Sequence, residues 1–176
     1  MTVVFAILFA LSDLMVIVRG YRPHCVSSLA TLQPHRALQS GPIGRPSGPM
    51  IQGIGSDLVQ VARMAAAYAR HGERLARRML AQGEWADFGR AASKPHFLAK
   101  RFAAKEALAK AVGTGLRPPV SLTAMAVGHD VLGKPVFEFE ADLAAWLTQK
   151  GMHRIHLSLS DERDMALAFV VIESGY

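Results

Sequence analysis

The sequence predicts an α+β domain with a long helix packed on a mostly antiparallel sheet. Residues 95–112 are rich in alanine and other strong helix formers, which predicts the longest helix of the chain. An apolar run at 50–56 has the character of a strand, as do two further runs near the C-terminus at 154–160 and 165–172. This combination of elements is typical of the α+β class, with the helices on one face of the sheet.

In the first half of the domain, the strand at 50–56 contains two glycines, and Asp57 follows at its predicted end. Short helices are expected next, separated by a break at His71-Gly72, and they cover residues 58–70, 73–80 and 84–88.

The long helix has recognisable signals at both ends. Ser93 precedes it as an N-cap, and Pro95 suits the first turn because its missing N–H is not needed there. Gly113 follows the last turn and tolerates the left-handed conformation that commonly ends a helix.

After Pro118-Pro119 the pattern changes from helix to strand. The elements expected here are strands at 120–127 and 136–140, a helix at 142–149, and the closing strand pair at 154–160 and 165–172.

The chain divides at Met50 into an extension, residues 1–49, and the domain, residues 50–176. Fifteen of the first 18 residues are apolar, but this run is short for a membrane span, which needs about 20 residues, and it contains Asp13. The first positive charge is Arg19, whereas a signal peptide begins with one. The main interpretation is that translation starts at Met50. The alternatives are a membrane anchor or signal, and a disordered native extension.

Composition excludes two classes of protein. With 51% hydrophobic and 19% charged residues, the chain is neither a disordered tail nor a short basic peptide. The net charge of +6 favours an anionic partner. Cys25 is the only cysteine, which excludes an internal disulfide and a cysteine-based metal site. The absence of cysteine from residues 50–176 fits a reducing cytoplasm.

The long helix carries the main candidate chemistry. Glu106 and Lys110 share one face, and Arg101 and Lys105 lie on a neighbouring row. These cations, followed by Gly-Thr-Gly at 113–115, indicate a phosphate site. A carboxylate fits such a site if a divalent cation such as Mg²⁺ lies between it and the phosphates. The alternative is that Glu106 and Lys110 form an ordinary surface pair.

Asp57 has two interpretations that do not exclude each other. A carboxylate at the end of a glycine-bearing strand is well placed as a ligand, and aspartate is also a good N-cap for the helix that follows. The seven histidines show no metal-binding spacing, and the chain has no nucleophile-elbow or P-loop motif.

Two segments together resemble one family closely. They are IQGIGSDLVQVAR at 51–63 and FLAKRFAAKEALAKAVGTG at 97–115, supported by LGKP at 132–135 and HLSLSDERDMALAFVVIES at 156–174. This pattern is similar to the holo-acyl-carrier-protein synthases, the small single-domain 4′-phosphopantetheinyl transferases. The resemblance covers essentially all of 50–174 and none of 1–49. Members typically start one residue before the first strand, where Met50 stands.

The resemblance implies the fold and the reaction. The fold would be that of the 4′-phosphopantetheinyl transferases, assembled as a homotrimer with active sites between subunits. The enzyme would transfer the phosphopantetheine arm of coenzyme A to a serine of apo-acyl carrier protein, releasing adenosine 3′,5′-bisphosphate. The expected setting is fatty acid biosynthesis in the cytoplasm, with no membrane or nucleic acid partner.

The resemblance also assigns residues. Asp57 and Glu106 match the family's magnesium ligands, and Lys110 matches a lysine that contacts the pyrophosphate. Further coenzyme A contacts are expected at Arg101, Lys105, Gly113, Thr114 and Gly115. The acidic carrier is expected to dock on Arg63, Met64 and Arg70.

Three questions stay open. Many members have a histidine where this chain has Asp161, so the role of this position is not assigned. The serine proton would go to Asp57 or to a metal-bound water. The alternative function is a non-catalytic basic module that binds nucleic acid. Two observations disfavour this nucleic-acid-binding function. Aromatic residues make up only 7% of the chain, and Glu106 interrupts the basic row.

Overall fold

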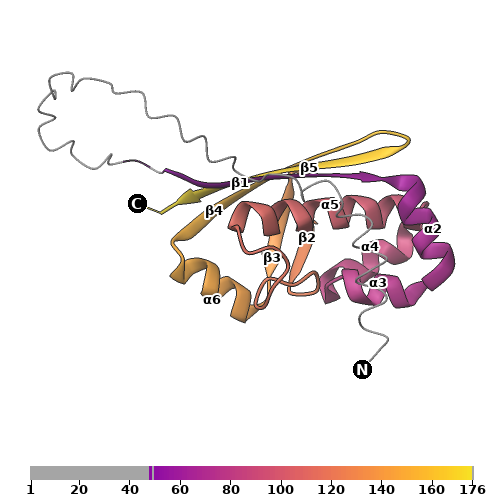
Figure 1. Cartoon of the computed structure of the whole chain (residues 1–176), viewed down its shortest axis with the longest axis horizontal. Coiled ribbons are helices and arrows are strands. Elements are labelled where there is room, and N and C mark those ends of the chain that lie inside the picture. Colours follow the sequence, from indigo (N-terminus) through magenta and orange to yellow (C-terminus); the bar gives the residue numbers. More distant parts are fainter. Residues whose placement is uncertain (1–47, 49, 176) are drawn as a thin grey trace, which may run out of the picture. The chain divides into compact units, whose positions relative to one another are not determined.

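The computed structural model describes residues 48 and 50–175 (Figure 1). The interpretation of residues 1–49 therefore falls almost entirely outside the described residues. Within the described part of the chain, no helix combines the length and the apolar character needed to cross a membrane.

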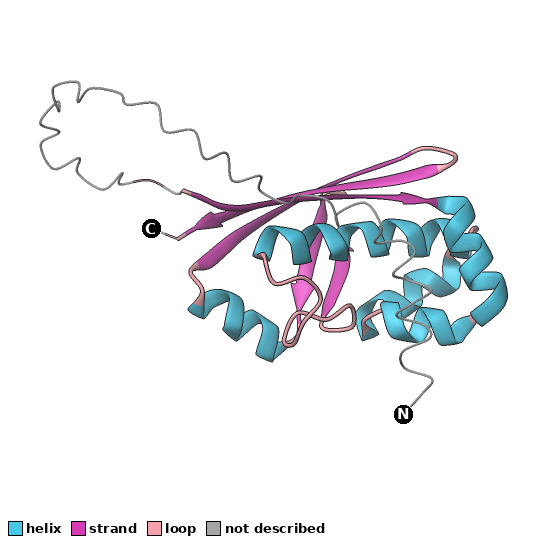
Figure 2. Ribbon diagram, viewed as in Figure 1, coloured by secondary structure: helices cyan, strands magenta, loops and turns pink. Residues whose placement is uncertain are grey.

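A three-stranded antiparallel sheet forms one layer of the domain, which agrees with the predicted, mostly antiparallel pairing. Its order is β1 (Ile51–Gln60), β5 (Met165–Ser174), β4 (Met152–Asp161), so the first strand pairs with the last (Figure 2). β1 ends four residues later than predicted, at Gln60 and not at Ser56. Pairing with β5 extends it, because Asp57 lies opposite Ala168 and Gln60 opposite Met165.

The extension of β1 corrects one interpretation of Asp57. This residue lies inside the strand and not at the start of the next helix. The N-cap position of α2 (Val61–His71) is Gln60, whose side chain makes no capping hydrogen bond. Asp57 is therefore not an N-cap.

A second, two-stranded sheet consists of β2 (Met125–His129) and β3 (Pro135–Phe139). The prediction of a strand over 120–127 is wrong for its first half. Residues 120–124 form turns, in which the N–H of Val120 bonds the carbonyl of Arg117 and that of Ala124 bonds the carbonyl of Ser121.

The helices agree with the predicted positions to within a few residues. Glu84 is the exception, because it belongs to a 3₁₀ turn and not to the helix expected at 84–88. Besides α2, the helical elements are α3 (Glu73–Met79), η1 (Gln82–Glu84), α4 (Trp85–Arg90), α5 (Lys94–Val112) and α6 (Ala141–Gln149). On α5, the Ser93 side chain accepts a hydrogen bond from the N–H of His96, and Gly113 ends the helix at φ 84°.

The long helix α5 packs along one face of the three-stranded sheet (Figure 1). The two glycines of β1 permit this contact. A Cβ added at Gly53 would lie 2.0 Å from the carbonyl oxygen of Ala111, and one at Gly55 would lie 2.0 Å from that of Ala107. The strand and helix backbones therefore approach more closely than any side chain allows.

The core fills the space between this sheet face and α5. Strand residues on the inner face and helix residues facing them are buried, and they include Val59, Ala166, Ala168, Val170, Ile172, Leu98, Phe102, Ala107 and Leu108. The opposite face of the sheet is different. Its large apolar side chains stay exposed, at Ile54, Leu58, Leu167 and Phe169.

Candidate active site

Asp57 and Glu106 come together from β1 and α5. Asp57 belongs to the strand face that packs on the helix, and Glu106 is 8% exposed. The pKa of Glu106 is raised from 4.5 to about 7, first by burial and then by the nearby charge of Asp57, while Lys110 opposes the shift. The two carboxylates are thus close enough to repel, which is an arrangement that a bound cation would stabilise.

Lys110 completes this cluster. Its Nζ lies 2.7 Å from Oδ1 of Asp57 and 3.0 Å from the carbonyl oxygen of Ser56. The hydrogen-bonded partner of Lys110 is therefore Asp57, on another element, and not Glu106 one turn away on the same helix.

The donor set fits magnesium better than zinc. Two carboxylates are available here, and the described residues contain no group of three or more His, Cys, Asp and Glu side chains suited to a metal. Magnesium is typically held by one or two carboxylates, with water and substrate phosphates completing its octahedron, whereas zinc sites use three or four protein ligands. Asp57 and Glu106 are the residues that would hold the ion.

The Gly-Thr-Gly loop lies at the same end of α5 as Lys110. Gly113 and Gly115 both have positive φ, 84° and 63°, and both are exposed. The Thr114 hydroxyl donates to the carbonyl of Gly115 at 3.0 Å. The loop thus turns sharply next to the carboxylate cluster, with two positions at which a ligand can approach the backbone.

Lys105 has a different role from the expected one. Its side chain is 0% exposed, and its ammonium donates to the carbonyls of Met79 and Leu122 and to the carboxylate of Glu84. Three acceptors satisfy all three N–H groups, so the expected contact with coenzyme A is corrected to an internal one. Burial lowers the pKa of Lys105 to about 8, although Glu84 opposes this shift.

Glu84 is a buried residue to which the sequence pattern assigned no role, although Glu84-Trp85 is one of the segments that resemble the family. It is 1% exposed, and besides Lys105 it accepts hydrogen bonds from the N–H groups of Ala81 and Val127. It thereby ties α5 to η1 and β2. The short Gln-Gly-Glu segment shows no pattern that indicates a buried carboxylate, so only the packing shows the burial.

Arg101 lies between this buried cluster and a pocket. Its Nε is 3.3 Å from Glu84, and its guanidinium lies over the ring of Phe97, 4.3 Å from the centroid. The pocket has a volume of about 420 Å³, and its lining includes Arg101, Lys100, His129, Gly133, Pro135 and Asp161. Arg101 is nearly buried, but it forms part of a wall that a ligand can reach.

Asp161, the position left open by the resemblance, is at the end of β4 beside this pocket. Its Oδ2 lies 3.1 Å from Nε2 of His96 and 3.3 Å from Nζ of Lys100. Asp161 therefore connects the end of β4 to the first turns of α5.

The three residues expected to contact a carrier all lie on α2 but differ in exposure. Arg63 and Arg70 are exposed. Met64 is only 1% exposed and belongs to the core. The expectation that Met64 contacts a partner is therefore corrected, because no surface of its side chain is available.

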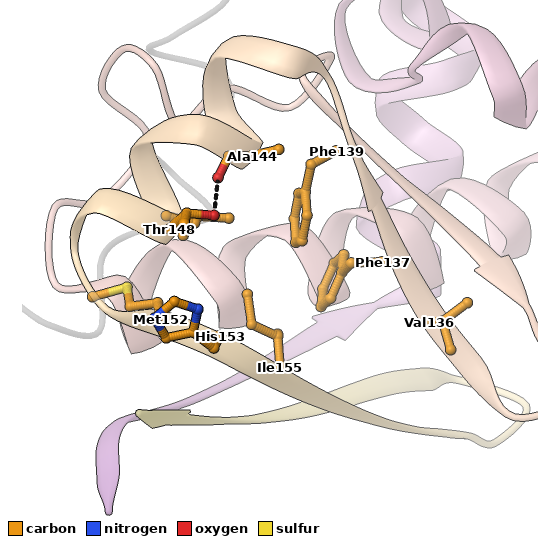
Figure 3. Close-up of a pocket in the computed structure, with 9 residues that line it drawn as sticks. Val136, Phe137, Phe139, Ala144, Thr148, Met152, His153 and Ile155 are labelled. Atoms are coloured by element: carbon orange, nitrogen blue, oxygen red, sulfur yellow. Dashed lines mark hydrogen bonds between the residues drawn. The ribbon is translucent and has the colours of Figure 1, made fainter. Parts of the chain in front are cut away.

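A second pocket lies between β3, α6 and β4, and seven of its nine lining residues are apolar (Figure 3). The stacked rings of Phe137 and Phe139 form part of its wall, with centroids 5.8 Å apart. The Thr148 hydroxyl donates to the carbonyl of Ala144 within α6, so it is not directed at a ligand. This pocket lacks the cluster of charged groups found around Asp57.

Comparisons with known proteins agree with this geometry. Residues 53–170 match the family model of the 4′-phosphopantetheinyl transferase superfamily. A holo-[acyl-carrier-protein] synthase of Laribacter hongkongensis is 61% identical over 124 residues, which are 70% of this chain and 99% of that protein. The synthase of Nitrosomonas europaea is 57% identical over the same shares.

Solved structures show the same relationship. The crystal structure of holo-[acyl-carrier-protein] synthase from Neisseria meningitidis is 48% identical and has a TM-score of 0.69, covering 71% of this chain and 100% of that one. The synthase of Bacillus anthracis in complex with CoA (3′,5′-ADP) is 34% identical with a TM-score of 0.60, covering 72% and 99%. The chain belongs to the 4′-phosphopantetheinyl transferase superfamily.

Proposed function

We propose that this protein transfers the 4′-phosphopantetheine arm of coenzyme A to a serine of apo-acyl carrier protein, releasing adenosine 3′,5′-bisphosphate. The observation that carries the proposal is the cluster of Asp57, Glu106 and Lys110, drawn from β1 and α5. The name of the relatives and the CoA-containing structure of the Bacillus anthracis relative support it.

Each residue of the cluster has a proposed task. Asp57 and Glu106 hold Mg²⁺, which supplies charge neutralisation at the pyrophosphate. Glu106 must lose its proton to do so, and its raised pKa makes this step sensitive to pH near 7. Lys110 neutralises phosphate oxygens, and the backbone of residues 113–115 allows these oxygens to approach closely.

We place the nucleotide end of coenzyme A in the pocket lined by Lys100, Arg101 and His129. Cationic side chains suit the phosphates of this ligand. Because the family resemblance implies sites between subunits, the pocket of one copy would serve the carboxylate cluster of another.

A homotrimer accounts for the exposed apolar face of the sheet. Ile54 and Leu58 on β1 are 56% and 57% exposed, and Phe169 on β5 is 44% exposed. A continuous apolar face of this kind commonly marks a contact between proteins. We propose that copies of the chain pack on it.

The proposed carrier surface is the exposed face of α2, with Arg63 and Arg70. Carrier proteins are acidic, and a basic helix attracts them by charge complementarity. The proposed setting is fatty acid biosynthesis in the cytoplasm, which agrees with the absence of cysteine from residues 50–176.

A mass-shift assay tests the function. Purified apo-carrier protein is incubated with coenzyme A, Mg²⁺ and the enzyme, and its mass should rise by one phosphopantetheine, with no change when EDTA is present. An unchanged carrier mass with Mg²⁺ would contradict the proposal. Salt-sensitive binding to DNA without binding to coenzyme A would favour the basic-module interpretation instead.

A further inference from the structure

The Lys110 ammonium occupies one carboxylate oxygen of Asp57, a residue proposed to hold the metal. The ammonium of Lys110 bonds Oδ1 of Asp57 at 2.7 Å and the carbonyl oxygen of Ser56 at 3.0 Å. It thereby brings one positive charge to the site of two carboxylates that repel each other. Glu106, one helical turn before Lys110, takes part in no hydrogen bond among the described residues through its carboxylate.

A divalent cation and the Lys110 ammonium repel each other, so holding both close to Asp57 is unfavourable in free energy. Two unit positive charges 4 Å apart repel measurably even in water, and the repulsion doubles when one of them is divalent. Bidentate or shared coordination by Asp57 and Glu106 also needs carboxylate oxygens free of other donors.

Lys110 is able to leave. Its side chain is 40% exposed, whereas Asp57 is 17% exposed, so the lysine is the mobile partner of the pair. A lysine ammonium is a point charge on a flexible four-carbon stem, and it can exchange one anionic partner for another without any backbone movement. The Gly-Thr-Gly loop that follows leaves open space on this side, since nothing lies within 4 Å of a Cβ built at Gly113 or Gly115.

We propose that the Lys110 ammonium is the counter-ion of Asp57 until a divalent cation binds, and that the cation displaces it from Asp57 and so delivers the ammonium to the substrate's phosphate oxygens. This inference rests on the proposed function for the identity of the phosphate ligand. The metal then binds before the substrate. Binding of the substrate phosphates is strengthened because the Lys110 ammonium has been released from Asp57.

Titration with Mn²⁺ alone tests the exchange without substrate or carrier. Free Mn²⁺ is measured by electron paramagnetic resonance at pH 8.5 with the full-length protein, Lys110→Met and Lys150→Met. Lys150 is an exposed lysine that directly follows α6, so its variant removes the same charge outside the cluster of Asp57, Glu106 and Lys110. Lys110→Met should bind Mn²⁺ roughly tenfold more tightly, and Lys150→Met should match the wild type. Unchanged or weaker binding in Lys110→Met would overturn the proposal.

A second readout follows Lys110 directly. In lysine NH₃⁺ NMR spectra, the Nζ resonance of Lys110 is identified by its loss in Lys110→Met. Adding Mg²⁺ to the wild type without coenzyme A should shift this resonance, because its bond to Asp57 breaks. A resonance that stays in place while Mg²⁺ binds would overturn the exchange.

The outcomes separate this inference from the proposed function. If the wild type transfers phosphopantetheine to the carrier but Lys110→Met binds Mn²⁺ no more tightly than the wild type, the exchange is refuted and the transferase function stands. Tighter Mn²⁺ binding without any transfer would refute the transferase function and leave the exchange standing.

Discussion

The ammonium of Lys110 and the carboxylate of Asp57 meet at 2.7 Å although 53 positions separate them in the chain. This bond joins the middle of β1 to the last turns of α5. It brings the two segments that carry the family resemblance into one site, together with the buried carboxylate of Glu106.

Replacing Glu106 by glutamine should stabilise the metal-free protein above pH 7 while abolishing Mg²⁺-dependent transfer. The folded-state pKa of about 7 exceeds the usual 4.5, so the folded protein holds this proton more tightly than the unfolded chain. Glu106 therefore makes the protein less stable as pH rises from 4.5 to 7, by about 3 kcal/mol in total. Urea unfolding in EDTA at pH 5 and pH 8 measures this. An equal pH dependence in wild type and Glu106→Gln would contradict it.

Substituting alanine for Gly55 should cost both stability and activity. The new Cβ would lie 2.0 Å from the carbonyl oxygen of Ala107, so α5 must move away from β1 and take Glu106 away from Asp57. We expect a loss of about 3 kcal/mol or more in the free energy of unfolding. The control is Gly89→Ala in α4, where nothing lies within 4 Å, and it should be neutral or stabilising by up to about 1 kcal/mol. Equal effects of the two substitutions would refute the explanation.

The buried pair of Glu84 and Lys105 should behave as structure and not as a substrate site. Glu84→Leu leaves the Lys105 ammonium buried without its counter-ion, which typically costs about 3–5 kcal/mol. The double variant Glu84→Leu/Lys105→Leu should recover part of that loss in denaturant unfolding. At a temperature where Lys105→Met is folded, its KM for coenzyme A should match the wild type. A strongly raised KM would restore the original assignment of Lys105.

A charge on the outer face of the sheet should break the proposed trimer. Phe169→Asp places a carboxylate among the exposed apolar side chains of β1 and β5, where burial against another copy is unfavourable. Size-exclusion chromatography with light scattering should show monomers. Val131→Asp serves as the control, because Val131 is fully exposed in the turn between β2 and β3. A Phe169→Asp protein that keeps the wild-type mass would contradict this role of the sheet face.

Reversing the charge of Arg70 should weaken carrier binding without changing coenzyme A binding. Arg70→Glu on α2 would repel an acidic carrier, and we expect its KM for the carrier to rise roughly tenfold. Lys150→Glu, the same charge reversal beyond α6, should have little effect. If both variants change the carrier KM equally, long-range charge and not docking on α2 explains the effect.

The helices could be predicted because their signals are local. Ser93 and Gly113 mark the ends of α5 through hydrogen bonds and backbone angles within a few residues. The ends of the strands were predicted less accurately. β1 continues to Gln60 because of its pairing with β5, more than 100 residues away, and no local pattern reports such a partner.

The candidate site shows the same division. Spacing along α5 placed Glu106 and Lys110 on one face, and the end of a glycine-bearing strand marked Asp57 as a candidate ligand. Only the family resemblance joined Asp57 to the other two residues, since β1 and α5 are distant in sequence. On the charged row of Arg101 and Lys105, the role of Lys105 was misinterpreted because a charged residue usually faces water. In this fold the same row faces Glu84, whose carboxylate compensates the burial.

The sequence by itself therefore determined the α+β class, the caps of the long helix and the family, because these depend on local propensities and on specific motifs. Tertiary structure alone decided which charges are buried, that Met64 belongs to the core, and that Lys110 bonds Asp57. The physical reason is that burial and ion pairing depend on which distant surfaces pack together. For Lys110 and Asp57, the close contact of the β1 glycines with the backbone of α5 brings the two elements together.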